Sequence, residues 1–118
     1  MGGFLLSSCK LSVPLEIQQS PDGKVSIEGI EHFGKPCIES LQIADSYALD
    51  ASVYWSVIIK PIDGPARPCF SKLTYPDTPV DFDLSSPARE LVTGRTYYVS
   101  ASGPGFDSSV EFVRRKVK

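Results

Sequence analysis

Three cysteines, Cys9, Cys37 and Cys69, are the residues of this chain with the clearest capacity for chemistry. A thiol can form a disulfide, accept a lipid or bind a metal ion. Metal binding is disfavoured, because the chain has no CxxC pair and His32 is its single histidine. An odd number of cysteines in an exported protein leaves one thiol over, so two different fates are expected for the three.

The residues before Cys9 predict a site of lipid attachment. Leu6-Ser7-Ser8-Cys9 fits a lipobox, with an aliphatic residue, two small residues and the cysteine that accepts a diacylglyceryl group. The apolar residues 2–6 would be the end of the signal's apolar core, although a whole signal has a basic start and a longer apolar run. The alternative is an edge strand or a frayed terminus with a chance cysteine.

Residues 1–9 are therefore interpreted as a partial lipoprotein signal segment, and residues 10–118 as one domain. Such a protein would be lipid-anchored in the bacterial envelope and face the periplasm. Lys10, rather than an aspartate, follows the cysteine. By analogy with lipoprotein sorting in enteric bacteria, this residue favours the outer membrane over the inner one.

The other two cysteines stand in similar surroundings, Lys35-Pro36-Cys37 and Arg67-Pro68-Cys69. Each proline precedes a predicted strand start and fixes the chain there. If Cys9 carries lipid, Cys37 and Cys69 are left to pair, which an exported protein permits. The disulfide would close a loop of about 33 residues and contribute roughly 3–4 kcal/mol in the chain-entropy model. The alternative is two buried, reduced cysteines.

Composition predicts one globular domain. The chain has 118 residues, of which 42% are hydrophobic and 22% charged, enough for a core and too apolar for extensive disorder. Its net charge is −2, with a basic tail at residues 114–118 on a mildly acidic body. This balance argues against nucleic-acid binding, which requires a basic face. The tail is expected to be a solvated end, or to touch anionic lipid or a partner.

Short alternating runs broken by turn residues predict an all-β fold. Ser20-Pro21-Asp22-Gly23 is typical of a turn, and residues 87–91 make at most one helical turn. We expect an Ig-like or fibronectin type III-like antiparallel β-sandwich of about 7–8 strands, with Trp55, Tyr97 and Val99 in its core. The expected strands cover residues 13–17, 25–27, 37–44, 52–60, 69–75, 80–84, 95–101 and 109–117.

One local motif sharpens this expectation. The segment from Leu91 through Gly94 to Tyr97 resembles the tyrosine corner of fibronectin type III and related Ig-like domains. The resemblance covers about ten residues and implies that the Tyr97 ring packs in the core while its hydroxyl binds upstream backbone. Thr93 stands where that family usually has proline.

No residue pattern indicates catalysis or a cofactor. His32 lies in a predicted loop and no GxSxG elbow frames a serine. Asp77, Asp81 and Asp83 lack the spacing of a calcium loop. A binding module without cofactors remains, and its candidate partner-binding residue is Phe106, at the glycine-rich tip of the predicted loop 102–107. Phe106 either contacts a partner there or folds back to plug the end of the sandwich.

The lipobox, the Pro-Cys strand starts and the Leu-x-x-Gly-x-x-Tyr strand together resemble small periplasmic type VI secretion immunity lipoproteins. The resemblance spans most of the chain without one anchoring motif. It implies a protein that neutralises a secreted toxin by binding it. The competing interpretations are an accessory or assembly lipoprotein of a pilus or secretion system, and a hydrolase with an unrecognised site. The oligomeric state is left open.

Cys9 is expected to be the mature N-terminus and to bear lipid, so the membrane fraction should contain an acylated Cys9 peptide detectable by mass spectrometry. Little before Val13 is expected to be buried, so a chain starting at Leu11 should melt at the same temperature as the longer form. A Cys9→Ser protein that still partitions with membranes, or a truncated domain that melts much lower, would contradict this interpretation.

Overall fold

Apolar residues at every second position form strands because successive side chains in a strand point to opposite faces. The computed structural model describes residues 13–30, 36–61 and 68–116. They contain no helix, and hence none that could cross a membrane. The strands are β1 (Leu15–Gln19), β2 (Val25–Gly29), β3 (Ser40–Ala44), β4 (Val53–Ile59), β5 (Lys72–Tyr75), β6 (Phe82–Ser86), β7 (Thr96–Gly103) and β8 (Phe106–Val113).

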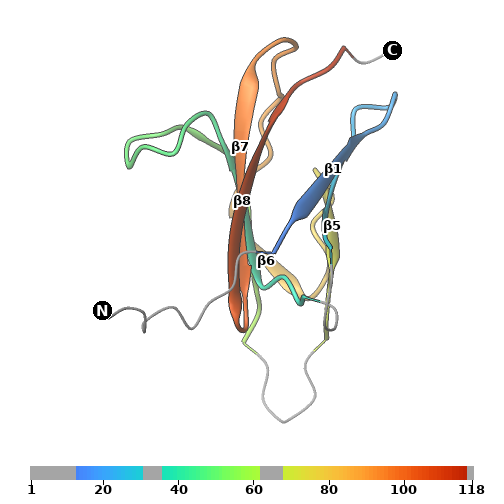
Figure 1. The fold of residues 1–118 in the computed structure, drawn as a ribbon, viewed down its shortest axis with the longest axis vertical. Helices are drawn as coiled ribbons and strands as arrows, with labels where there is room; N and C mark the ends of the chain where they lie inside the picture. The colour runs from blue at the N-terminus through green and yellow to red at the C-terminus, as the bar shows by residue number, and fades with distance from the viewer. Residues whose placement is uncertain (1–12, 31–35, 62–67, 117–118) are drawn as a thin grey trace, which may run out of the picture.

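The strands form two antiparallel sheets, which confirms the predicted β-sandwich. One sheet has the order β1-β2-β5 and the other the order β6-β4-β3-β7-β8. Figure 1 shows the two layers side by side, with β1 and β5 in one and β7 and β8 in the other. The second sheet has β6 and β8 as its edges, and its outer face is turned away from β1 and β5.

The core lies between the sheets and contains the residues expected there. Trp55, Tyr97 and Val99 are all 0% exposed. The Trp55 ring packs edge-on against Tyr75 of the opposite sheet, with centroids 5.7 Å apart. This contact joins the two layers through their largest side chains, and such aromatic pairs add to the area that they bury.

The tyrosine corner is present as predicted. The Val92 amide donates a hydrogen bond to the Tyr97 hydroxyl over 2.8 Å, and Gly94 provides the turn with a φ of +87°. Positive φ is easily adopted by glycine because it has no Cβ. The corner fixes how the chain enters β7, although Thr93 replaces the usual proline.

The loop between β7 and β8 is shorter than the predicted 102–107, and of the two alternatives for Phe106 the buried ring is the one observed, while the exposed ring offered to a partner is wrong. Pro104 and Gly105 alone form the β7–β8 turn, because Gly103 already pairs with Phe106. Phe106 is the first residue of β8, 2% exposed, and therefore plugs the end of the sandwich. It fits because Gly103 lacks a side chain: a Cβ there would lie 2.8 Å from the Phe106 ring and 1.9 Å from the Cys37 carbonyl oxygen.

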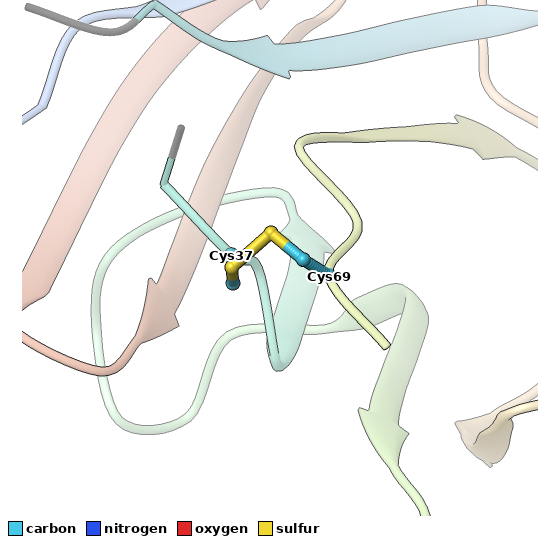
Figure 2. The surroundings of a disulfide bond; sticks show 2 residues. All are labelled: Cys37 and Cys69. Atoms are coloured by element: carbon cyan, nitrogen blue, oxygen red, sulfur yellow. A yellow bond between two sulfur atoms is a disulfide. The ribbon is translucent and has the colours of Figure 1, made fainter. Parts of the chain in front are cut away.

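The predicted disulfide is also confirmed. Cys37 and Cys69 are bonded, with Cα atoms 4.8 Å apart (Figure 2). Next to them the Ile38 amide donates to the Phe70 carbonyl over 2.7 Å. Cys37 leads into β3 and Cys69 into β5, so the bond ties the two sheets together at the end that Phe106 closes.

Replacing Tyr97 by phenylalanine should lower the free energy of unfolding by about 1–2 kcal/mol, because the Val92 amide loses its acceptor while the ring stays buried. Urea unfolding followed by tryptophan fluorescence measures this. Tyr98→Phe is the matched control, since Tyr98 faces outward on the same strand, and it should change stability by less than about 0.5 kcal/mol. Equal effects of the two substitutions would contradict a role for the corner.

Replacing both Cys37 and Cys69 by alanine should lower the free energy of unfolding by about 3–4 kcal/mol, because the bond restricts a loop with a sequence separation of 32. Guanidinium unfolding of the variant and of the wild type, each with and without reductant, measures this. Reductant should destabilise only the wild type. A wild-type protein whose unfolding is insensitive to reductant under denaturing conditions would argue against the bond.

Candidate functional site

The loop between β3 and β4, residues 45–52, projects sideways from the five-stranded sheet, away from β1 and β5, in Figure 1. We call it the β3–β4 loop. Its own hydrogen bonds fix its base: the Asp45 amide donates to the Ser52 carbonyl over 3.1 Å, and the Ser52 amide donates to the Asp45 carboxylate over 3.0 Å. Hydrogen bonds between Asp45 and Ser52 thus close the loop at its base.

The tip of the loop has two further hydrogen bonds. The Ala51 amide donates to the Ala48 carbonyl over 3.1 Å, and the Ala48 amide donates to the Ser46 hydroxyl over 3.0 Å. Serine and aspartate favour such local turns because their short side chains reach nearby backbone groups. The loop is therefore shaped by its own sequence and not only by its neighbours.

A β-bulge directs the β3–β4 loop away from the sandwich. The register of β3 and β4 shifts between Ile43 and Ala44, because Ala44 pairs with Val53 and Ile43 with Trp55. Tyr54 is the extra residue on β4. A bulge bends the strand and increases its twist, so it re-aims the connection beyond it.

Tyr54 is held firmly at the base of β4. The Arg95 guanidinium donates to the Tyr54 hydroxyl over 2.9 Å, and the Arg89 guanidinium lies over the Tyr54 ring, 4.3 Å from its centroid. The Arg89 amide also donates to the Tyr54 carbonyl over 2.8 Å. These contacts fix the point at which the loop re-enters the sheet.

Two large side chains of this ordered loop face solvent. Leu49 is fully exposed, at 108%, and Tyr47 is 56% exposed. Tyr47 packs edge-on against Tyr98 of β7, with ring centroids 4.6 Å apart. Tyr98 lies on the outer face of its sheet, because its neighbours Tyr97 and Val99 point into the core. The loop is thus braced against the outer face of the five-stranded sheet.

That outer face is lined by small polar side chains. Ser40, Gln42, Ser56, Ser100 and Ser102 are among the residues that surround a shallow hollow of about 240 Å³. The Ser40 and Ser102 hydroxyls lie 2.6 Å apart across the β3–β7 pair. Ile58, 48% exposed, borders the hollow. The candidate interface therefore combines a protruding apolar tip with a recessed, hydroxyl-rich surface.

Of the residues singled out from the sequence, Cys37, Cys69 and Phe106 do not lie at this interface. Cys37 and Cys69 are structural and Phe106 belongs to the core. Cys9 and His32 lie outside the described residues. Asp77 forms an ion pair with Lys24, and the described residues contain no group of three or more acidic, histidine or cysteine side chains placed to hold a metal ion.

Sequence reasoning missed Tyr47 and Leu49. The available signal was Leu49 itself, an apolar residue among aspartate, serine and alanine between two strands. That signal is weak, since single exposed leucines are common on protein surfaces. Its importance depends on the hydrogen-bonded, projecting backbone, which only the structure displays.

Comparison with known proteins identifies no relative: no protein-family model, no curated protein and no solved structure matches this chain.

Proposed function

We propose that this protein is a binding module whose interface is the β3–β4 loop together with the outer face of the five-stranded sheet, and that its partner is a protein. The full exposure of Leu49 on a loop closed by its own hydrogen bonds carries the proposal. Exposed apolar side chains gain free energy when a partner covers them.

The hydrogen bonds that close the loop support an interface better than the exposure of Leu49 alone does. Ordering a flexible loop on binding costs about 0.5–1.5 kcal/mol for each immobilised side chain, and a preformed loop avoids much of this cost. Tyr47 adds a large ring that Tyr98 already orients, and tyrosine is enriched among residues that dominate binding energy. The recessed serine and glutamine side chains beside it would supply hydrogen bonds for specificity.

We further propose that the module acts in the bacterial envelope, anchored by a lipid on Cys9 and facing the periplasm. The Cys37–Cys69 disulfide supports an oxidising compartment, where such bonds persist. In this setting, the resemblance to type VI secretion immunity lipoproteins favours a secreted toxin as the partner. The module would neutralise it by covering a functional surface, which requires no catalytic residue.

Leu49→Asp should weaken partner binding at least tenfold, about 1.4 kcal/mol, because it places a charge where an apolar side chain is buried in the complex. The partner is captured from envelope and secreted proteins, identified by mass spectrometry, purified and titrated calorimetrically. Val80→Asp is the matched control, because Val80 is 83% exposed outside the interface. Both variants should melt within about 1 °C of the wild type.

Toxin neutralisation has its own readout. Cells that export the captured partner should stop growing, and wild-type protein should restore growth while Leu49→Asp does not. A captured pilus or secretion component without toxicity would overturn the immunity role and leave the binding module standing. Equal affinity of the wild type and Leu49→Asp would overturn the proposed interface itself.

A further inference from the structure

Arg114, just beyond β8, is a buried cation for which the described residues supply only one hydrogen-bond acceptor. The residue is 7% exposed. Its Nη2 donates to the Gly23 carbonyl oxygen over 3.0 Å, while Nε and Nη1 are buried and have no hydrogen-bond partner among the described residues. Arginine stays charged at every physiological pH, and leaving its donors unpaired away from water is costly. A hydrogen-bond acceptor placed at Nε and Nη1 would remove this cost.

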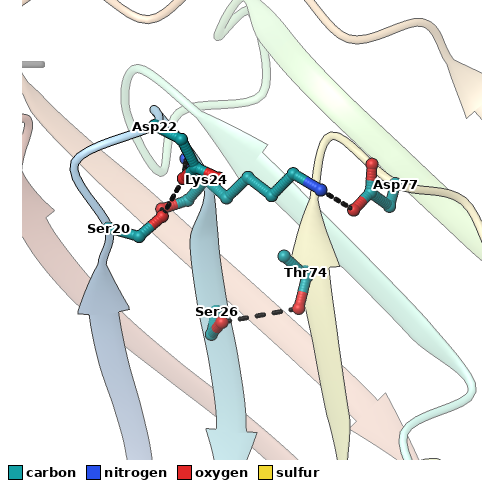
Figure 3. Close-up of polar contacts among 6 residues, drawn as sticks. All are labelled: Ser20, Asp22, Lys24, Ser26, Thr74 and Asp77. Atoms are coloured by element: carbon teal, nitrogen blue, oxygen red, sulfur yellow. Dashed lines mark hydrogen bonds and ion pairs between the residues drawn. The ribbon is translucent and has the colours of Figure 1, made fainter. Parts of the chain in front are cut away.

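No acidic side chain of the described chain neutralises Arg114. The single ion pair in residues 13–30, 36–61 and 68–116 joins Lys24 to Asp77, 2.9 Å apart (Figure 3). That contact raises the pKa of Lys24 and holds its ammonium group at the turn that follows β5. Asp22 accepts a hydrogen bond from the Ser20 hydroxyl, which lowers the pKa of Asp22 and keeps it within its own turn. Within residues 13–30, 36–61 and 68–116, the Arg114 charge therefore has no acidic side chain paired with it.

A hollow of about 210 Å³ lies beside this arginine. Its walls are Gln19, Ser20 and Pro21 on one side, and Arg114, Arg115 and Lys116 on the other. The Gln19 side chain donates to the Val113 carbonyl over 2.9 Å and accepts from the Arg115 amide over 2.9 Å. Gln19 thus fastens the end of β1 to the chain after β8 and brings three consecutive cationic residues against the β1–β2 turn.

We propose that this hollow binds a phosphate-type oxyanion, with Arg114 as the residue that contacts it. A phosphate carries several acceptor oxygens and up to two negative charges, which suits three cationic side chains better than a single carboxylate does. Arg115 and Lys116 are exposed and would draw the anion toward the buried guanidinium. Arg114 lines the hollow, but Nε and Nη1 are closed to solvent in this structure, so an anion reaches them only when the residues around the guanidinium rearrange.

This site is independent of the β3–β4 loop, which lies on another part of the sandwich (Figure 1). The phosphate can belong to a free small molecule or to a lipid headgroup. Both present the same oxygens to Arg114, so the chemistry is common and the experiment separates the sources.

The test uses inorganic phosphate as the probe. Thermal unfolding in phosphate is compared with unfolding in chloride at equal ionic strength, and affinity is measured by calorimetry. At a phosphate concentration 100-fold above Kd, the melting temperature of the wild type should rise by about 5 °C or more. Arg114→Met keeps the length of the side chain and removes the buried charge, so it should fold, melt no lower in chloride, and show no rise with phosphate.

Two further variants make the outcome decisive. Lys24→Ala removes a cation that Asp77 already engages, so it should leave phosphate affinity unchanged. The double variant Arg115→Ala with Lys116→Ala alters only exposed side chains and should weaken affinity at least threefold. No phosphate-specific rise in the wild type, or an equal rise in Arg114→Met, would overturn the site. If Arg114→Met does not fold, the double variant decides: unchanged affinity overturns the site.

Vesicles identify the source of the phosphate. The site would be assigned to an anionic headgroup if two results are obtained. The wild type cosediments with phosphatidylglycerol vesicles but not with phosphatidylcholine vesicles, and Arg114→Met abolishes this cosedimentation. Phosphate binding without cosedimentation would assign it to a free phosphate. Cosedimentation that survives Arg114→Met would reflect general attraction to the basic tail and would count against the site as a headgroup receptor.

Discussion

Packing of Trp55 and Tyr97 between the two sheets is the interaction on which the rest of the structure depends. Each aromatic side chain buries about 150–250 Å² when fully enclosed, and both residues are 0% exposed. Trp55 reaches across to Tyr75, while Tyr97 contacts Tyr54 and Phe112 within its own sheet. These contacts fix the separation of the layers and the orientation of β4 and β7, from which the β3–β4 loop and its brace at Tyr98 follow.

The two ends of the sandwich are closed in different ways. At one end the Cys37–Cys69 bond, the backbone of Gly103 and the ring of Phe106 fill the space between the sheets with apolar or covalent contacts. At the other end Arg114 and the β1–β2 turn meet through one hydrogen bond, and two guanidinium nitrogens have no partner in the part of the chain that the structure describes. The first end is built for stability. The second end contains buried polar groups without partners among the described residues, as ligand-binding sites often do.

The β3–β4 loop is suited to binding because of the contacts that hold it in place. Leu49 has no contacts that hold it, but Asp45 and Ser52 close the loop, the bulge at Ala44 and Val53 aims it, and Tyr98 braces Tyr47. A single exposed leucine would be unremarkable on a mobile segment. On a backbone held by the amide hydrogen bonds of Asp45, Ala48, Ala51 and Ser52 it becomes an anchor that a partner can cover with little loss of entropy.

The sequence by itself determined the fold class, the pairing of Cys37 with Cys69, the tyrosine corner at Tyr97 and the burial of Trp55. These features depend on short-range signals: alternation with period two, turn residues, cysteine surroundings and a local motif. Only the tertiary structure decided that Phe106 begins β8 inside the core, since its burial depends on the empty space over Gly103. Only the structure likewise brought Arg114 to Gly23 and directed Leu49 outward. Those placements arise from contacts between residues far apart in the chain, such as the 91-residue separation of Arg114 and Gly23, and no local pattern encodes such a distance.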